Sequence, residues 1–315
     1  LVGVIVAVLF YTNPNASWYS GRFTIYIAGR NTVSEIRGNP LAVGQMGGVV
    51  AVAAALMLPV RGGPVVNLLR IAAILTGLGL ALTSGSRAQA VLAVLAIVLF
   101  YPMARRIKNV RQFFLTAGGL AAVMGVIAVG LRLFLGQTRE QTQRWDVANW
   151  SQTISDRIGD AMLLIREYAN SPQAWLQGLG TNAFSAVSGW PISYAHNAPV
   201  EMLCELGLIG LTLYCLAMYL AFRAGRRLFR ANADDTWNRA TVATLLGLCF
   251  YSFTLSLKQY TFVAMPEPWW LLVILAKLAT HDQELHRHAE NAAWHSGEYY
   301  DPEDAAEPDS EAVPT

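Results

Sequence analysis

The sequence predicts an all-α membrane protein, a polytopic bundle of transmembrane helices with one large helical loop outside the bilayer. Two observations carry this expectation. Apolar residues make up 54% of the 315-residue chain and charged residues only 14%, a balance too apolar for a soluble globular domain. The apolar residues also gather in runs of roughly 20, the length at which a helix crosses a bilayer core of about 30 Å.

The apolar runs are distributed along almost the whole chain. We expect helices at 1–11, 41–60, 66–83, 88–102, 113–135, 199–222, 240–257 and 261–279. Each run can lie in lipid because a helix satisfies its backbone hydrogen bonds internally. The chain opens inside an apolar run without a charged flank, so we expect residues 1–135 to be transmembrane helices of a protein whose first helices precede this sequence.

Basic residues predict how the bundle is oriented. Eleven Lys and Arg lie in or beside the short loops on one side of the predicted bundle, against five on the other side. The first side is therefore predicted to be cytoplasmic. Strict alternation then places the loop 12–40, the turn 84–87 and the long segment 136–198 on the outer face, and returns residues 199–279 to the membrane.

The C-terminal segment 280–315 has a different composition. It carries ten acidic residues, one arginine and three prolines without apolar periodicity, which predicts a disordered cytoplasmic extension. Its four histidines could bind a metal, but their spacing is irregular: His281, His286, His288 and His295. We expect no metal and no other cofactor.

Arg87 opens an apolar helix on the predicted outer face. At a helix centre this charge would cost roughly 2.5 to 3.5 kcal/mol, so we expect it to face water, a partner or a ligand. The N-terminus of a helix also favours an anion. An arginine that snorkels to the interface would explain the position equally well.

The large outer loop contains an amphipathic segment, 145–170. Apolar residues recur there with a helical period at Ile154, Ile158, Ala161, Met162 and Ile165. We expect a helix that lies on the membrane or caps the bundle and ends before Pro172. Arg157 falls off the apolar stripe, where it could pair with Asp160 or act in catalysis. The GLG at 178–180 follows no predicted strand, so it does not predict a dinucleotide site.

His196 is the only histidine among the first 280 residues, and it stands directly before an apolar helix. An imidazole with a pKa near 6.5 suits a general base, but an isolated histidine here is more simply explained as a helix cap or as a structural hydrogen bond at the membrane interface. Asn197 and Pro199 follow at the expected start of the helix. Glu205 lies inside the apolar run, where a carboxylate is costly unless it is protonated, paired or facing a cavity.

Taken together, these residues resemble the O-antigen ligase and O-antigen polymerase superfamily of bacterial membrane glycosyltransferases. The signature HN…E-x-G-L-x-G of that superfamily is similar to His196-Asn197 followed by Glu205-Leu206-Gly207-Leu208 and Gly210. SGSRAQAVLAVL around Arg87 resembles its S-x-S-R-x-x segment, IRGNPLAVGQ resembles its G-x-x-N-P stretch, and Arg157 matches an arginine opening its periplasmic helix. The resemblance covers about residues 30 to 280.

The resemblance implies a C-type glycosyltransferase-like fold in the bacterial inner membrane. It also implies a glycan donor on undecaprenyl diphosphate, used without metal and with inversion at the periplasmic face. The acceptor would be lipid A core for a ligase or a growing glycan for a polymerase, and a protein O-oligosaccharyltransferase is a third version. The implied catalytic residues are His196 as base and Arg87 and Arg157 on the leaving diphosphate. Further substrate contacts are expected from Arg37, Asn197, Glu205 and Lys258.

Two other classes of function remain open. A flippase or transporter of lipid-linked glycans would need polar residues through several helix centres and often an internal repeat, whereas the polar candidates here gather at one face. A non-catalytic membrane scaffold would leave Arg87, Arg157 and His196 as unrelated interface residues. Membrane lipids are expected partners in every case, and no nucleic acid is expected.

Overall fold

A computed structural model describes residues 5, 8–9, 12–19, 22–27, 36–37, 40–59, 62–105, 107, 109–134, 147–189, 194–258 and 267–296. Its strands are β1 (Ala16–Tyr19), β2 (Arg22–Ile27) and β3 (Ile36–Arg37). Its helices are α2 (Pro40–Leu56), α3 (Pro64–Thr83), α4 (Arg87–Arg105), α5 (Val110–Phe134), α7 (Val147–Ala169), α8 (Ala174–Gln177), α9 (Ala183–Ser188), α10 (Ala198–Ala231), α11 (Thr236–Ser256) and α12 (Glu267–Ser296).

Helices dominate the described residues, as the apolar runs predicted, and every expected run after residue 40 corresponds to a helix. Three helices are long and apolar enough to cross a membrane: α3, the part of α4 from Ala88 to Arg105, and α10. α2 and the first part of α5 are apolar but shorter. The expected helix at 1–11 lies mostly outside the described residues.

Two regions differ from the prediction. The loop 12–40 contains a three-stranded antiparallel sheet in the order β1-β2-β3, so the all-α prediction was wrong there. The strands are rich in aromatic and β-branched residues, and Ser-Gly, a typical turn dipeptide, separates Tyr19 from its partner Arg22. The second difference is α12, which continues to Ser296, so the predicted disorder was wrong for 280–296; residues 297–315 lie outside the described part.

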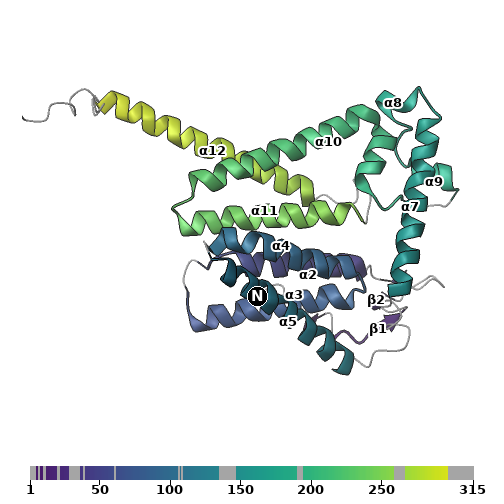
Figure 1. Ribbon diagram of the computed structural model, residues 1–315, viewed down its shortest axis with the longest axis horizontal. Helices are drawn as coiled ribbons and strands as arrows, with labels where there is room; N and C mark the ends of the chain where they lie inside the picture. Colours follow the sequence, from purple (N-terminus) through teal and green to yellow (C-terminus); the bar gives the residue numbers. More distant parts are fainter. Residues whose placement is uncertain are drawn as a thin grey trace, which may run out of the picture.

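The long helices lie side by side and define two ends of the bundle (Figure 1). α7 and strands β1 and β2 lie at one end, which we call the sheet end. α2 and α4 both begin there, joined by a hydrogen bond of 2.6 Å from Gln89 Nε2 to the Leu41 carbonyl oxygen. α2 ends at the opposite end, which we call the far end, where Arg70 of α3 donates to the carbonyls of Ala54 and Ala55.

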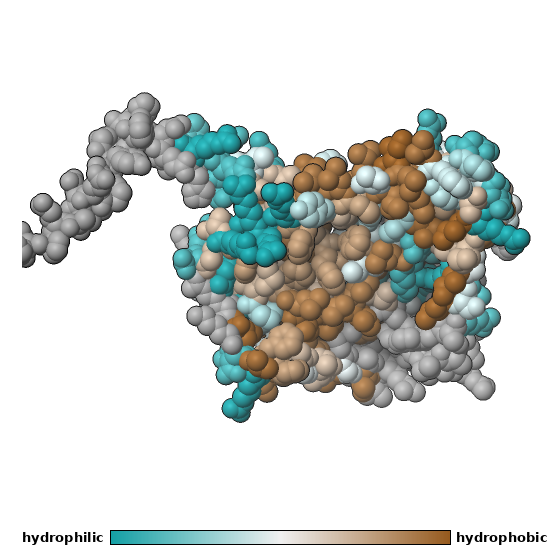
Figure 2. Space-filling view, turned by 45° about the horizontal axis from the view of Figure 1, so that its top comes forward, coloured by the Kyte–Doolittle hydropathy of each residue, from teal (hydrophilic) through white to brown (hydrophobic). Residues whose placement is uncertain are grey.

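Apolar and polar side chains separate along the length of the bundle (Figure 2). In this view apolar side chains cover the middle of the visible face, and hydrophilic side chains gather toward both ends. Many large apolar side chains of α3 and α10 are exposed, among them Leu68, Ile71, Leu213 and Leu216. Such a surface is unusual for a soluble protein and suits contact with lipid.

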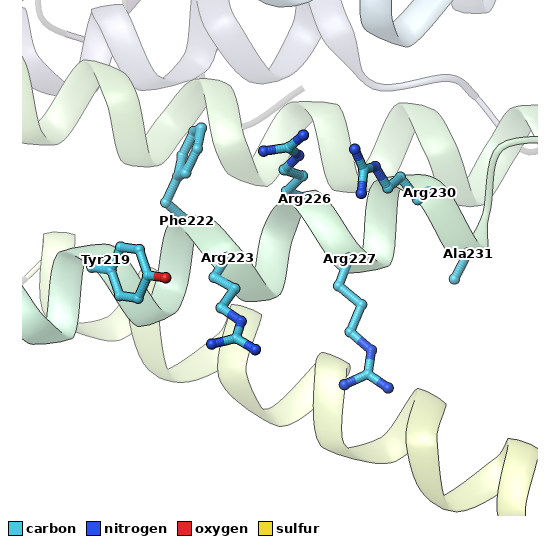
Figure 3. Close-up of a pocket in the computed structure, with 7 residues that line it drawn as sticks. All are labelled: Tyr219, Phe222, Arg223, Arg226, Arg227, Arg230 and Ala231. Atoms are coloured by element: carbon cyan, nitrogen blue, oxygen red, sulfur yellow. The ribbon is translucent and has the colours of Figure 1, made fainter.

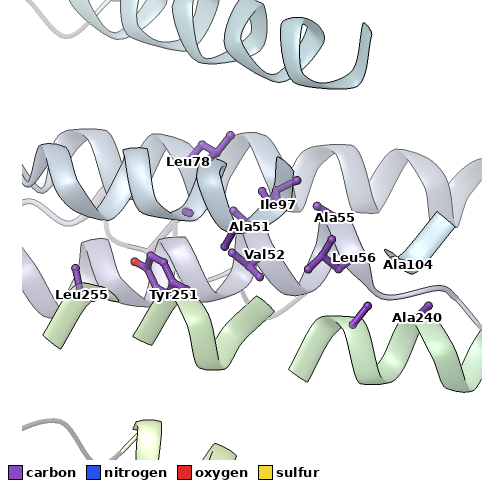
Figure 4. Close-up of a cluster of buried hydrophobic side chains, with 13 residues drawn as sticks. Ala51, Val52, Ala55, Leu56, Leu78, Ile97, Ala104, Ala240, Tyr251 and Leu255 are labelled. Atoms are coloured by element: carbon purple, nitrogen blue, oxygen red, sulfur yellow. The ribbon is translucent and has the colours of Figure 1, made fainter. Parts of the chain in front are cut away.

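Small residues allow the helices of the bundle to pack closely around one apolar cluster (Figure 4). The cluster includes Val52 and Leu56 of α2, Leu78 of α3, Ile97 of α4 and Tyr251 of α11. α2 and α3 approach where a glycine on each helix faces the backbone of the other. Close backbone approach through small residues is the usual way for apolar helices to pack in lipid.

Substituting Gly47 with alanine should loosen this packing. The added Cβ would collide with the Gly77 carbonyl oxygen, a backbone atom that cannot turn away, so we expect destabilisation of about 1 to 3 kcal/mol. Gly118 in α5 has nothing within 4 Å of an added Cβ, and Gly118→Ala should be neutral or slightly stabilising through helix propensity. The midpoints of thermal unfolding of the two variants in detergent, with size-exclusion chromatography as the readout, would measure the difference in stability. Equal midpoints would contradict the packing argument.

Candidate functional site

The start of α10 fixes the segment that carries His196. Asn197 is the N-cap, and its Oδ1 accepts a hydrogen bond of 3.1 Å from the Val200 N–H, with proline in the first turn. The cap is therefore Asn197, and the capping alternative for His196 was wrong. A role for Asn197 in substrate binding remains a prediction.

His196 adopts a left-handed backbone conformation, with φ of 58°. This conformation costs a side-chain-bearing residue about 1 to 2 kcal/mol, so its surroundings must hold it. Glu201, only 1% exposed in the first turn of α10, accepts a hydrogen bond of 2.8 Å from the Ala195 N–H. The buried carboxylate thus ties the residue before His196 to the helix after it. Strained residues held in this way are common at functional sites.

Two cations and a tyrosine surround the His196 ring. Tyr194 packs edge-on against it with ring centroids 4.3 Å apart. Arg157 of α7 and Lys258, just after α11, both act on the imidazole electrostatically. Arg157 Nη1 donates a hydrogen bond of 2.6 Å to the Lys258 carbonyl oxygen, which fixes α7 against the end of α11. We call Arg157, Tyr194, His196 and Lys258 the histidine cluster.

Burial and charge determine the protonation of this cluster. Burial, together with the repulsion of a further positive charge by Arg157 and Lys258, lowers the pKa of His196 to about 4. Burial also raises the pKa of the Tyr194 hydroxyl, so the phenol stays neutral. Burial lowers the pKa of Arg157, but a guanidinium remains charged near neutral pH. At pH 7 the cluster therefore holds a neutral imidazole beside permanent positive charge.

We expect the imidazole of His196 to titrate with a midpoint near 4 rather than the ordinary 6.5. Because an unfolded chain would bind this proton first, acidification through that window should also destabilise the folded protein. Replacing the four C-terminal histidines with glutamine leaves His196 as the only imidazole, which histidine-selective NMR can follow. Arg157→Gln should move the midpoint upward. A midpoint near 6.5 in the otherwise unaltered protein would contradict the burial argument.

Arg157 is held by the Lys258 carbonyl, whereas Asp160 acts on it only electrostatically. The predicted alternative, an ion pair between Arg157 and Asp160, is therefore not what positions the guanidinium. A guanidinium has five N–H donors, so the bond from Nη1 leaves others for an anion. The remaining predicted cations are placed by backbone alone, because the side chains of Arg87 and Arg37 lie outside the described residues. Arg87 begins α4, whose first turn lies at the sheet end, and Arg37 lies in β3 opposite Tyr26.

Glu205 does not contact the histidine cluster in any described interaction. It is buried and accepts hydrogen bonds from the N–H groups of Asn182, Ala183 and Phe184 at the start of α9, with 3.0 Å from Ala183 to Oε1. In this geometry the carboxylate holds two helices together and does not orient His196, and the expected contact of Glu205 with substrate stays a prediction. The carboxylate joins α9 to α10.

Gly207 breaks α10 and explains the glycines at 178–180. Its φ of 69° interrupts the helix, so the carbonyls of Cys204 and Glu205 turn toward another part of the chain. The N–H groups of Leu179 and Gly180 donate to these two carbonyls at 2.7 and 3.1 Å. The GLG segment is thus bound to the broken helix by backbone hydrogen bonds, and we call residues 178–180 the strap.

Gly207→Ala should detach this strap. An added Cβ would collide with the Leu176 carbonyl oxygen, in addition to the cost of about 1 to 2 kcal/mol for positive φ. Gly189 is a matched control because its φ is 70° and an added Cβ would meet nothing within 4 Å. We expect Gly207→Ala to be about 1 to 3 kcal/mol less stable than Gly189→Ala and more rapidly cleaved by protease between 170 and 195. Equal cleavage of the two variants would argue against docking.

Sequence reasoning missed several residues around the site. Tyr194 contacts the His196 ring, Arg22 of β2 acts electrostatically on Tyr194, and Glu201 fixes the preceding backbone. A signal for Glu201 existed, because an acidic residue in the first turn after an Asn cap is typical of a helix start. Arg22 gave no signal, since the sheet that carries it was predicted as loop.

No family model and no curated protein sequence matches this chain. The chemistry must be argued from the residues themselves: a neutral imidazole, a guanidinium and a further cation at one end of an apolar bundle. Within the described residues, no three His, Cys, Asp or Glu side chains gather as a metal site would require. The histidine cluster is suited to a reaction in which the imidazole accepts a proton and the nearby cations stabilise developing negative charge.

Proposed function

We propose that this protein is a membrane glycosyltransferase that moves a glycan from undecaprenyl diphosphate to an acceptor hydroxyl, as an O-antigen ligase does. The single observation that carries the proposal is the histidine cluster. It unites a neutral imidazole with a fixed guanidinium from a segment 39 residues earlier, at the end of the bundle where α4 begins at Arg87. The motif resemblance described above supports the same assignment.

The proposed reaction forms one bond and breaks one. The acceptor oxygen attacks C1 of the donor sugar from the face opposite the leaving group, so the anomeric centre inverts. The bond between C1 and the phosphate oxygen breaks, and undecaprenyl diphosphate departs with the bonding electrons. His196 takes the proton of the attacking hydroxyl, which a neutral imidazole can do at pH 7. Arg157, with Arg87, stabilises the charge on the diphosphate through bidentate hydrogen bonds.

The topology follows from the charge pattern and completes the proposal. A polytopic bundle in the bacterial inner membrane would have its far end, with the Arg clusters of α4 and α10, in the cytoplasm. The sheet end and the histidine cluster would then face the periplasm, where lipid-linked glycans are joined to their acceptors. The three helices with the length and composition of membrane spans support this arrangement.

Complementation tests the proposal. A gene encoding the complete protein is expressed in a host without O-antigen ligase, and lipopolysaccharide banding is compared between unaltered protein and His196→Asn at matched membrane expression. Banding restored by the first and lost in the second would support ligase activity. If neither restores banding while glycan chains lengthen in a polymerase-deficient host, the polymerase alternative replaces the ligase. Transfer to protein would favour an oligosaccharyltransferase, and transbilayer movement of donor without transfer would favour a flippase.

A further inference from the structure

A solvent-open cavity with polar and apolar lining lies at the far end of the bundle, away from the histidine cluster. Its volume is about 600 Å³, and three helices and the turn before α5 line it. The polar lining residues are Asn67 and Arg70 of α3, Tyr101 and Arg105 of α4, and Gln112 and Thr116 of α5. The remaining lining side chains are apolar, with Ile71 and Ile74 on one wall and Leu115 on another.

Two guanidinium groups from different helices share this cavity. Arg70 is held in place by hydrogen bonds of 3.1 and 3.3 Å to the last carbonyls of α2, which orient the fork and leave further N–H groups unused. Arg105 lies over the Tyr101 ring at 5.8 Å from its centroid. The two positive charges act on each other across the cavity. The Nε of Arg105 is buried, and no described residue accepts a hydrogen bond from it.

This part of the chain supplies no negative charge to offset the two arginines. The sequence from residue 36 to residue 139 contains neither Asp nor Glu, although it contains nine Arg and one Lys. Like charges held together without a carboxylate are unfavourable unless an anion joins them. The planar donors of arginine match phosphate oxygens in particular.

The surroundings of the cavity identify which phosphate fits. The cavity opens between α3 and α5, which contact each other and present exposed apolar side chains beside it. Leu68 and Ile71 are 66% and 54% exposed on α3, and Phe114 and Leu115 are 67% and 65% exposed on α5. A free anion would gain nothing from this apolar border, whereas the acyl chains of a lipid would lie along it.

We propose that this cavity binds the headgroup phosphate of an anionic glycerophospholipid, with Arg70 and Arg105 on the phosphate and the acyl chains along α3 and α5. The site differs from the other arginine group at the far end, Arg223, Arg226, Arg227 and Arg230. Those four project from the single helix α10 in diverging directions and are exposed (Figure 3). They line a separate pocket of about 610 Å³ on α10, so Arg226→Gln removes a charge from the same end of the bundle outside the proposed site.

Native mass spectrometry of the full chain in detergent tests the proposal with phosphatidylglycerol as probe. We expect the protein to retain one phosphatidylglycerol more tightly than phosphatidylcholine, and Arg105→Gln to weaken this binding about tenfold or more. Arg226→Gln removes the same charge from the same end and should change binding less than twofold. Arg105→Lys keeps the charge without the planar fork and should lie between the two.

Several outcomes would overturn the proposal. Equal loss in Arg105→Gln and Arg226→Gln would mean diffuse electrostatic attraction. Equal retention of phosphatidylglycerol and phosphatidylcholine by the unaltered protein would mean that the cavity does not select an anionic lipid. This comparison does not depend on whether a variant folds. Displacement of phosphatidylglycerol by millimolar inorganic phosphate would mean that the cavity takes the free anion and that the lipid is incidental.

Discussion

Replacing His196 with asparagine should abolish glycan transfer while leaving the protein folded. The loss of a general base typically lowers a rate by about 10²- to 10⁴-fold, and asparagine has no basic nitrogen to replace the imidazole. Asparagine also tolerates the left-handed backbone of this position, with its φ of 58°, better than most residues do. Transfer assayed in proteoliposomes with matched protein content would measure the effect.

Alanine at the same position is a less informative change. It removes the imidazole but keeps the strained left-handed backbone without the ring contact to Tyr194 that helps to hold it, so lost activity could reflect a displaced loop. Glycine separates the two effects, because it relaxes the strain and still lacks a base. We expect His196→Asn and His196→Gly to be equally inactive with unchanged thermal midpoints. Substantial transfer by either variant would remove His196 from the proposed chemistry.

Arg157→Gln should have an effect of similar size through the leaving group. Removing a fixed donor for developing charge costs about 10²- to 10³-fold in rate, and glutamine also loses the hydrogen bond that ties α7 to the Lys258 carbonyl. The rate of the chemical step should fall more than donor affinity, since the diphosphate gains charge as its bond to the sugar breaks. Single-turnover transfer at saturating donor would isolate that step.

A control for Arg157 lies on the same helix. Arg166 is exposed in the last turn of α7, and Arg166→Gln removes the same charge from the same helix. Its transfer rate should stay within about twofold of the unaltered protein, because an exposed charge is screened by solvent and salt. Arg157→Lys should recover only part of the activity, since an ammonium cannot form the bidentate contact. Equal rates for Arg157→Gln and Arg166→Gln would exclude the guanidinium from the reaction.

Hydropathy predicts the helices of this chain well because a long apolar run can satisfy its backbone hydrogen bonds internally only as a helix. Hydropathy does not predict the segments whose structure depends on strand pairing or on intrinsic helix propensity. The strands near residues 16–37 lie in a polar loop whose pairing depends on tertiary context. The helical stretch 280–296 holds only three of the ten acidic residues of 280–315, together with three alanines, so the composition of the whole segment was misleading as a sign of disorder there.

The candidate site shows the same division. His196 and Arg157 were recognisable as polar residues in unusual places, and the sequence predicted them on one side of the bundle. Their contacts were not predictable, since the bond from Arg157 to Lys258 joins positions 101 residues apart. The role of Glu205 was also hidden, because its partners at 182–184 lie in a loop without periodicity.

The contacts that build the site differ greatly in sequence separation. The strap at 178–180, the start of α9 and the first turns of α10 are connected within about 30 residues, so little chain entropy opposes their assembly. The contact between Arg157 and the Lys258 carbonyl must instead close a loop that includes all of α10 and α11. Contacts of long range form late in folding as a rule. The loop around His196 should therefore assemble first. Arg157 should be fixed beside His196 only once α11 is in place.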